Sequence, residues 1–140
     1  KTLYLFGNNL SDTLPSFNDG LALEEIKLYG NNLSGVIPES IENLLQLSNL
    51  QLNHNNLSGE IPINLSRLPN MNTLKLSHNQ LTGLIPIEIC NIERVYLEDN
   101  ILTGPVPDCV CNMVYISLSN NKLCEDPPNC IDIGPQSCSP

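Results

Sequence analysis

One pattern recurs six times along this chain and constrains the fold more than any other feature of the sequence. Its copies read LYLFGNNL (3–10), IKLYGNNL (26–33), LQLNHNNL (50–57), LKLSHNQL (74–81), VYLEDNIL (95–102) and ISLSNNKL (116–123). Successive copies are 23, 24, 24, 21 and 21 residues apart. A unit of this length cannot bury its apolar face alone, so the copies are predicted to stack as coils around a shared core.

The apolar alternation in each copy predicts a short strand whose Leu, Ile or Val side chains face the core. One Asn follows each strand, at Asn8, Asn31, Asn55, Asn79, Asn100 and Asn121. The chain must turn inward there, which buries backbone groups that need partners. Because a side-chain amide both donates and accepts hydrogen bonds, these Asn are predicted to form a buried ladder between coils. A general preference of Asn for turns does not explain six copies in register.

A second motif follows the Asn in four copies, namely LSGVIP (33–38), LSGEIP (57–62), LTGLIP (81–86) and LTGPVP (102–107). Gly suits a tight bend and a residue before Pro prefers an extended backbone, so a small second sheet is predicted beside the first. The first copy reads LSDTLP, and we expect a looser turn where Asp12 replaces Gly. The apolar spacing after Pro38 and Pro62 predicts one or two helical turns on the outer side.

With these motifs the chain resembles the plant-specific type of leucine-rich-repeat protein, whose signature is LxxLxLxxNxLSGxIP. The resemblance covers nearly the whole chain, and it extends to ectodomains of receptor-like kinases and receptor-like proteins and to secreted polygalacturonase-inhibiting proteins. It implies an α/β repeat solenoid, a right-handed superhelix with a parallel concave β-sheet and a convex side of loops, 3-10 turns or short helices. It also implies an extracellular protein that recognises proteins, peptides or glycans.

The expected organisation is six repeats over residues 1–123 and a disulfide-tied C-terminal cap over 124–140. Relatives carry a cysteine-bearing cap before the first repeat, whereas Lys1 enters directly at a predicted strand. We therefore interpret the chain as a fragment of a longer array.

All six cysteines lie near the C-terminal end, which indicates an oxidising compartment. Coils stack about 4.7–4.9 Å apart on the strand side, close to the Cα separation of a disulfide. Joining equivalent positions of successive coils, and pairing the cysteines left over, predicts Cys90–Cys111, Cys109–Cys130 and Cys124–Cys138. The alternative for the tail is Cys124–Cys130. The two cysteines of CVC (109–111) are too close in sequence for an ordinary zinc site, and no His follows them.

Side chains that flank the inward Leu point outward from the concave sheet and form the predicted binding surface. All four Tyr, both His and three of the six Lys and Arg residues fall there, and Tyr and Arg are favoured anchors of interfaces. The predicted ligand-binding residues are Tyr4, Phe6, Lys27, Tyr29, Gln51, His54, Lys75, His78, Arg94, Tyr96 and Tyr115. The alternative is that Tyr is simply well suited to strands.

His54, His78 and Asp99 occupy one position in successive coils, and such side chains can bind a divalent metal. No supporting residues can be identified around them, and a surface His is usually only solvated, so no metal or cofactor is predicted. A contact whose strength depends on pH is an alternative role for the two His.

Four N-glycosylation sequons, each reading NLS, begin at Asn9, Asn32, Asn56 and Asn64. Asn64 is the preferred candidate because it is predicted on the outer side of the solenoid. The other three directly follow a ladder Asn, and their NLS can be a by-product of the repeat.

The net charge of −9 argues against binding to nucleic acid, and no apolar run of about 18 residues predicts membrane contact within this chain. No nucleophile–base pair, phosphate-binding loop or paired carboxylates indicate an enzyme. The leading interpretation is a recognition module of a cell-surface receptor ectodomain that binds a protein or peptide. The alternatives are a secreted inhibitor of a cell-wall-degrading hydrolase, recognition of a glycan, and a structural spacer without a dedicated ligand.

Overall fold

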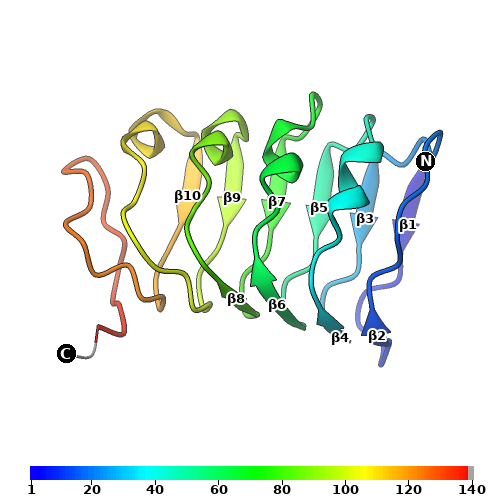
Figure 1. Ribbon diagram of the computed structural model, residues 1–140, viewed down its shortest axis with the longest axis horizontal. Helices are drawn as coiled ribbons and strands as arrows, with labels where there is room; N and C mark the ends of the chain where they lie inside the picture. Colours follow the sequence, from blue (N-terminus) through cyan, green and yellow to red (C-terminus); the bar gives the residue numbers. More distant parts are fainter. Residues whose placement is uncertain (139–140) are drawn as a thin grey trace.

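The computed structural model describes residues 1–138 and shows coils stacked in a row from one end of the chain to the other (Figure 1). Each coil contributes one strand to a six-stranded parallel sheet of order β1-β3-β5-β7-β9-β10. These strands are β1 (Thr2–Tyr4), β3 (Glu25–Lys27), β5 (Asn49–Gln51), β7 (Thr73–Lys75), β9 (Arg94–Tyr96) and β10 (Tyr115–Ser117). The register places equivalent residues side by side, such as Leu50 and Leu74. The predicted repeat solenoid with a parallel sheet is confirmed.

A second parallel sheet has the order β2-β4-β6-β8 and lies along another edge of the coils (Figure 1). Its strands are β2 (Ser11–Thr13), β4 (Asn32–Gly35), β6 (Asn56–Glu60) and β8 (Gln80–Thr82). The expectation of a looser turn at Asp12 is wrong, because Asp12 has a φ of 84° and Gly35, its equivalent, has 73°. Asp tolerates the left-handed region better than most residues, and here its Oδ1 accepts a hydrogen bond from the Thr13 N–H at 2.9 Å.

Four short 3-10 helices lie on the outer side of the coils, in agreement with the predicted convex side. They are η1 (Glu39–Asn43), η2 (Ile63–Arg67), η3 (Ile87–Asn91) and η4 (Asp108–Asn112). Each begins directly after a Pro in extended conformation. Proline suits that place because its ring fixes φ and its nitrogen has no hydrogen to leave unpaired. No helix in residues 1–138 is long and apolar enough to span a membrane.

Leu and Ile side chains from successive coils fill the interior between the two sheets and the 3-10 helices. Leu50 and Leu74 from the first sheet, Leu57 and Leu81 beside the second, and Leu65 from η2 are at most 1% exposed. Removing one such side chain typically costs about 2–5 kcal/mol. This shared core is what holds the coils in register.

The Asn ladder predicted from the sequence is present, and it joins each coil to the one before it. The Asn55 Nδ2 donates to the carbonyls of Leu52 in its own coil and Leu28 in the preceding coil, both at 3.0 Å. Its Oδ1 accepts from the Leu33 N–H at 3.0 Å. The same three contacts recur at Asn31, Asn79, Asn100 and Asn121. The rungs therefore bond Asn to backbone and not Asn to Asn.

Asn8 does not belong to the buried ladder, and the prediction made for it is wrong. It is exposed, and its Nδ2 donates to the carbonyls of Leu5 and Phe6 within its own coil.

The sequence analysis missed a further rung, which a glutamine supplies near the C-terminal end. The Gln136 Nε2 donates to the Leu118 carbonyl at 3.0 Å and to the Ile133 carbonyl at 2.9 Å. Its Oε1 accepts from the Leu123 N–H at 3.2 Å. These are the three contacts of a ladder Asn, so the segment IDIGPQ (131–136) forms part of a shortened seventh coil. This segment belongs to the predicted cap over 124–140, whose residues 139 and 140 lie outside the described part of the chain.

The structure corrects the predicted disulfides Cys90–Cys111 and Cys109–Cys130. Its bridges are Cys90–Cys109, Cys111–Cys130 and Cys124–Cys138, with Cα separations of 5.9, 5.6 and 5.7 Å. The third is the pair predicted for the tail, and the alternative Cys124–Cys130 does not occur.

Two features of the 3-10 helices explain the correction. Packed helices are farther apart than strands, about 8–10 Å, so equivalent positions on the outer side are too distant for a disulfide. A 3-10 helix has about three residues per turn, so residues two apart in η4 point to different sides. Cys109 therefore reaches back to Cys90 in η3, whereas Cys111 reaches forward to Cys130.

Candidate binding face

The outward side chains of the six-stranded sheet and of the turns that follow its strands form one surface, which we call the sheet face. The eleven residues predicted to bind a ligand all lie on it, and all are exposed or half-buried. Their strand neighbours, such as Leu50 and Leu74, point into the core. The alternation of the strands thus presents the aromatic and charged side chains to solvent.

The N-terminal end of the sheet face carries a group of five residues, the N-terminal cluster, made of Tyr4, Phe6, Glu25, Lys27 and Tyr29. The Phe6 and Tyr29 rings stack with centroids 4.7 Å apart and planes 4° apart. The Glu25 Oε2 lies 2.8 Å from both the Tyr4 hydroxyl and the Lys27 Nζ. Lys27 Nζ also lies 4.4 Å from the centre of the Tyr4 ring. These contacts preorganise aromatic surface on β1 and on the segments that follow β1 and β3.

The polar contacts in this cluster shift two ionisation equilibria. The hydrogen bond from Lys27, and next the one from Tyr4, lowers the pKa of Glu25. The hydrogen bond to Glu25, and next the one to Tyr4, raises the pKa of Lys27. Both groups therefore remain charged over a wider pH range than isolated side chains do.

The opposite end of the sheet face carries the C-terminal cluster, made of Lys75, Tyr96 and Tyr115. Lys75 Nζ lies 4.9 Å from the centre of the Tyr96 ring. The Tyr96 and Tyr115 rings are 4.7 Å apart at a tilt of 34°. Arg94, on the same strand as Tyr96, pairs with its neighbour Glu93 at 3.3 Å. Cation and aromatic ring are thus combined at both ends of the face, in β3 with β1 and in β7 with β9.

Between the two clusters the face is polar. On β5, the Gln51 Nε2 donates to the Asn49 Oδ1 at 3.1 Å. The Asn53 Oδ1, which follows β5, and the Glu98 Oε2, which follows β9 within the C-terminal cluster's coils, are buried and find no hydrogen-bond partner within residues 1–138. The search for anchor residues in the sequence passed over both, because it favoured aromatic and basic side chains. The signal that identifies them in the sequence is their place in the repeat, which is the same as that of Phe6 and Tyr29.

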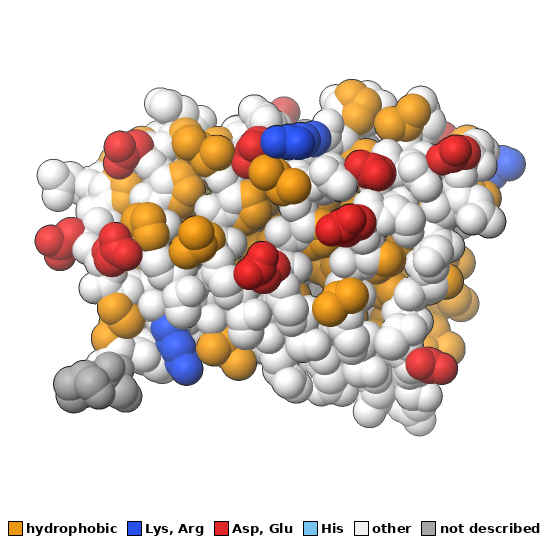
Figure 2. Space-filling view, in the orientation of Figure 1, with side chains coloured by type: hydrophobic (Ala, Val, Ile, Leu, Met, Phe, Trp, Pro, Cys, Tyr) orange, Lys and Arg blue, Asp and Glu red, His pale blue; other side chains and the backbone are white. Residues whose placement is uncertain are grey.

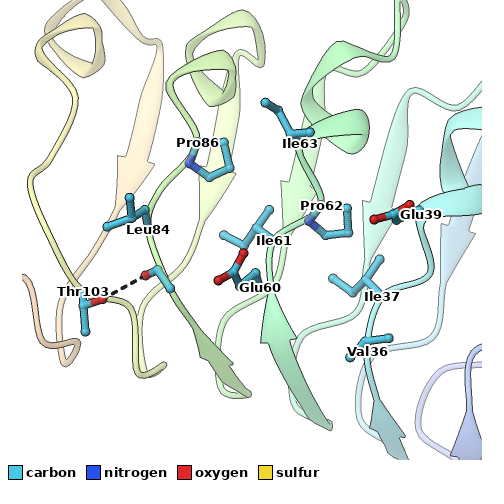
Figure 3. Close-up of a pocket in the computed structure, with 11 residues that line it drawn as sticks. Val36, Ile37, Glu39, Glu60, Ile61, Pro62, Ile63, Leu84, Pro86 and Thr103 are labelled. Atoms are coloured by element: carbon cyan, nitrogen blue, oxygen red, sulfur yellow. Dashed lines mark hydrogen bonds between the residues drawn. The ribbon is translucent and has the colours of Figure 1, made fainter.

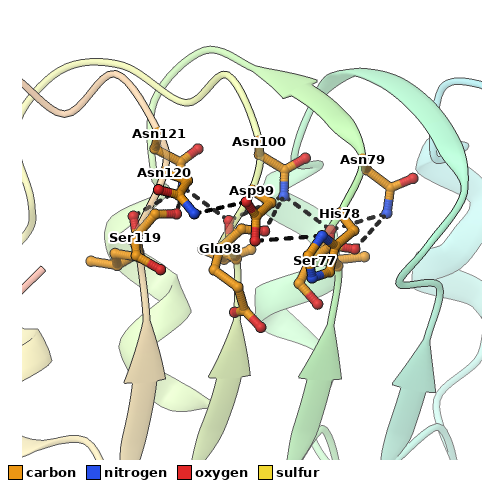
Figure 4. Close-up of polar contacts among 12 residues, drawn as sticks. Ser77, His78, Asn79, Glu98, Asp99, Asn100, Ser119, Asn120 and Asn121 are labelled. Carbon is orange, nitrogen blue, oxygen red and sulfur yellow. Dashed lines mark hydrogen bonds and ion pairs between the residues drawn. The ribbon is translucent and has the colours of Figure 1, made fainter. Parts of the chain in front are cut away.

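A row of four side chains, the turn row, runs along the end of the strands from His54 through His78 and Asp99 to Asn120. The two imidazole rings stack with centroids 4.1 Å apart. The His78 Nδ1 lies 3.4 Å from the Asp99 Oδ2, and the Asn120 Nδ2 donates to the Asp99 Oδ1 at 2.8 Å (Figure 4). The row thus links the four coils that contain β5, β7, β9 and β10 at the surface, directly beside the buried ladder.

The backbone explains which residue types occupy the turn row. All four residues have a φ between 54° and 56°, and Gly7 and Gly30 take the left-handed region in the first two coils. Gly, Asn, Asp and His are the residues most often found there. No group of three potential metal ligands occurs within residues 1–138. The turn row is therefore accounted for by the inward turn of the chain.

The structure reverses the order of accessibility expected for the four sequons. Asn9, Asn32 and Asn56 are exposed, whereas Asn64, the preferred candidate, is half-buried. The hydroxyl residue of its sequon, Ser66, is 1% exposed, and its Oγ donates to the Ile63 carbonyl at 2.8 Å. Asn64 lies in η2, a 3-10 helix whose Leu65 and Ser66 are buried, so a place on the outer side does not by itself make its side chain accessible.

Comparison with known proteins places these features in a wider group. A sequence profile described as Leucine Rich Repeat matches residues 22–44, 46–68 and 70–92. None of the curated protein sequences matches the chain at a significant level.

Solved structures of plant proteins are similar over most of this chain. The plant peptide hormone receptor RGFR1 in complex with RGF2 is 31% identical over 98% of the chain, with a TM-score of 0.89. The ectodomain of the Arabidopsis thaliana receptor kinase GASSHO1/SCHENGEN3, in complex with CASPARIAN STRIP INTEGRITY FACTOR 2, is 34% identical over 88%, with a TM-score of 0.78. A plant ice-binding protein is 34% identical over 87%, with a TM-score of 0.80. The chain spans 24%, 16% and 42% of these three proteins respectively.

Proposed function

The chain belongs to the leucine-rich-repeat family, of the plant type, and on that premise we propose that its sheet face recognises a peptide or protein ligand outside the cell. Two of the similar structures are receptors in complex with the ligands named above. The disulfides support an extracellular location, because such bridges persist in oxidising compartments. The proposed role is binding and needs no catalytic step.

The observation that carries this proposal is the pair of aromatic clusters at the two ends of the sheet face. Their rings are oriented by contacts between coils, yet Tyr4, Phe6 and Tyr115 remain 44–47% exposed. Ordered aromatic side chains bind well because little freedom is lost when a partner covers them. A side chain that merely suited a strand would need no such partner in the next coil.

The dimensions of the face suit an extended peptide. Five spacings separate β1 from β10, which corresponds to roughly 24 Å at about 4.8 Å per strand. An extended chain covers that length with about seven residues. Such a ligand would contact both clusters at its ends and the half-buried polar side chains of Asn49 and Gln51 along its middle.

The bases on the face indicate the charge that the ligand carries at one end. Lys27 is already paired with Glu25 at 2.8 Å. Lys75 is half-buried against Tyr96 and has no ion pair among residues 1–138. An acidic group of the ligand would therefore bind at Lys75, where the aromatic ring already holds the ammonium group.

Selection from a random peptide library displayed on phage tests the proposal, with the dissociation constant of each enriched peptide measured by calorimetry. We expect Tyr29→Ala and Tyr96→Ala each to weaken binding about 30-fold, since an interface anchor contributes about 2 kcal/mol or more. The matched control is Leu45→Ala, which removes an exposed apolar side chain outside the sheet face. Peptides that bind both Tyr variants and the wild-type chain equally would refute the assignment.

We further propose that this module forms part of a receptor ectodomain and not of a secreted hydrolase inhibitor. The support is that two of the similar structures are receptors. Mapping the transcript beyond Pro140 tests this finer proposal. A segment that encodes a membrane-spanning helix and a kinase supports the receptor, whereas an immediate stop codon favours the secreted inhibitor.

A further inference from the structure

A second surface of the molecule, away from the sheet face, contains an apolar hollow of about 740 Å³. Its main lining residues are Val36, Ile37, Glu60, Ile61, Ile63 and Leu84, and we call it the flank groove (Figure 3). Ile37 and Ile61 are 2% and 4% exposed and form its floor, whereas Val36 and Leu84 are 57% and 61% exposed. Apolar side chains gather visibly on this side of the molecule (Figure 2). Such a patch marks an interaction site more often than an isolated exposed Leu does.

The second sheet creates this groove through a repeated feature of the sequence. The residue after each motif Gly is exposed, which gives Val36, Glu60 and Leu84 equivalent outward positions on successive coils. Each stands over the Gly of the next coil. A Cβ on Gly59 would lie 2.8 Å from Val36 Cγ1, and one on Gly83 would lie 2.8 Å from Glu60 Cγ. The glycines thus allow these side chains to lie flat, with the hollow open above the buried Ile floor.

The charge within the groove is negative. The Glu60 carboxyl group lies within the apolar lining, and Glu39 stands at the right-hand side of the groove in this view (Figure 3). Neither carboxylate has an ion pair or a side-chain hydrogen bond with any residue in 1–138. Arg67, on η2, is engaged with Glu88 at 3.1 Å. A base from outside the chain would therefore complement the groove.

These observations distinguish between possible occupants. A second copy of this chain carries the same net charge of −9, so like charges oppose self-association. Three of its six Lys and Arg residues lie on the sheet face, on a different surface. The volume lies within the range of about 300–1,000 Å³ that is typical of binding pockets. The apolar floor requires apolar side chains, and the two carboxylates require a base beside them.

We propose that the flank groove binds a partner protein through a segment in which apolar side chains alternate with Lys or Arg. The groove shares no residue with the sheet face. Both surfaces can therefore be occupied at once, and a ligand on the sheet face does not exclude this partner. The proposal stands or falls independently of the function proposed for the sheet face.

Two synthetic heptapeptides serve as probes, one of alternating Lys and Leu and one of alternating Glu and Leu. Their dissociation constants for the whole chain are measured by fluorescence anisotropy. We expect the Lys peptide to bind at least 10-fold more tightly. Leu84→Ser should weaken it at least 10-fold, whereas the matched change Leu45→Ser, at a Leu that is 57% exposed outside the groove, should alter it less than 2-fold.

A charge reversal provides the second arm. We expect Glu60→Lys to weaken the Lys peptide at least 10-fold and to strengthen the Glu peptide. Glu42→Lys makes the same change in net charge at an exposed position outside the groove, and it should shift both affinities less than 3-fold. Equal effects of the two reversals would mean attraction by net charge alone and would overturn the proposal.

Methyl NMR of the unaltered chain keeps the test independent of any variant. The Lys peptide should shift the methyl signals of Val36, Ile63 and Leu84. Shifts confined to residues outside the groove, or equal losses of affinity in Leu84→Ser and Leu45→Ser, would refute it.

Discussion

The coils up to Pro86 and the coils after it share one core but differ in length and in covalent links. The ladder Asn are 23 or 24 residues apart in the first half and 21 apart in the second. All three disulfides lie in the second half, between Cys90 and Cys138.

The disulfides compensate for a loss of apolar burial on the outer side of the coils. The 3-10 helices and the residues up to the next strand bury three apolar side chains in each of the first two of these coils, then two, then one. These side chains are Ile41, Leu44 and Leu47, then Leu65, Leu68 and Met71, then Ile89 and Ile92, and finally Val110. Each lost side chain removes about 1.5–3 kcal/mol of burial, and a disulfide contributes about 2–4 kcal/mol. Covalent links thus replace apolar burial where the outer segment is short.

Reduction of the disulfides should produce the largest difference in stability between the two halves. Bridges Cys90–Cys109 and Cys111–Cys130 each span 19 residues and should each contribute about 3 kcal/mol. We expect hydrogen exchange of amides after Pro86 to accelerate more than 100-fold in a reducing agent, and that of earlier coils less than 10-fold. The reducing agent is inert toward the first half, which has no cysteine before Cys90. Equal acceleration in both halves would show that the coils unfold as one unit.

Loss of a ladder rung should have the next largest effect, and it should be equal in the two halves. Asn55→Ala and Asn100→Ala each leave two buried carbonyls and one buried N–H without their amide partner. Such groups cost about 1–3 kcal/mol each, so we expect the free energy of unfolding to fall by about 3 kcal/mol in denaturant titrations. Asn8→Ala, at an exposed Asn, should cost less than about 1 kcal/mol. A much smaller loss at Asn100 would mean that the disulfides hold the coils of the second half together even without a rung of the ladder.

Substitutions in the turn row test its structural role. His54→Val forces a β-branched residue to a φ of 55°, which should lower the free energy of unfolding by about 1–2 kcal/mol. Asn120→Val in the second half should cost a similar amount, since its φ is 56°. His54→Gly should cost little, because Gly30 already fills this position in the preceding coil. A large loss for the Gly variant would show that the stacked imidazoles, and not the backbone, decide the residue type.

The smallest effect concerns pH, and in the first half it arises from the Glu25–Lys27 pair. Glu25 has a lowered pKa in the folded state, so its contribution to stability is present above its ordinary pKa and lost as pH falls through the folded value. Lys27 has a raised pKa, so its contribution is present below its ordinary pKa and lost as pH rises through the folded value. When the pH is lowered from 7 to 2, the melting temperature of the wild-type chain should therefore fall more than that of Glu25→Gln. Parallel curves would indicate that this exposed pair contributes nothing measurable.

The features that could be predicted from the sequence are those that every coil repeats. Six strands, the Asn ladder and the second sheet each rest on a residue type that recurs in register, so the physical reason applies to each copy. The 3-10 helices follow from Pro38 and its equivalents in the same way. The exposed position of Tyr4, Tyr29 and Tyr96 follows from the alternation of the strands. Periodicity supplied this information, because a single copy of the motif would be ambiguous.

Features that depend on orientation or on a single copy could not be predicted in this way. The disulfide partner of Cys109 and that of Cys111 depend on the direction in which each side chain points from a 3-10 helix. The rung at Gln136 escaped detection because it lies 15 residues after Asn121 and is not an Asn. The flank groove arises from Val36 and Leu84 at positions where other coils carry Thr13, Glu60 and Pro105, so no repeat signal marks it.

The ladder amides have a consequence for the order in which the molecule forms. Each one reaches back, so the Leu33 N–H finds its acceptor only when Asn55 arrives in the next coil. A ribosome releases the chain from its N-terminal end, and every turn must therefore wait until roughly one more repeat has emerged. During synthesis the folded part of the chain would therefore grow coil by coil, about one coil behind the part that has emerged from the ribosome. Gln136 supplies the acceptor for the Leu123 N–H, so the turn that contains Leu123 can form only after Gln136 has emerged.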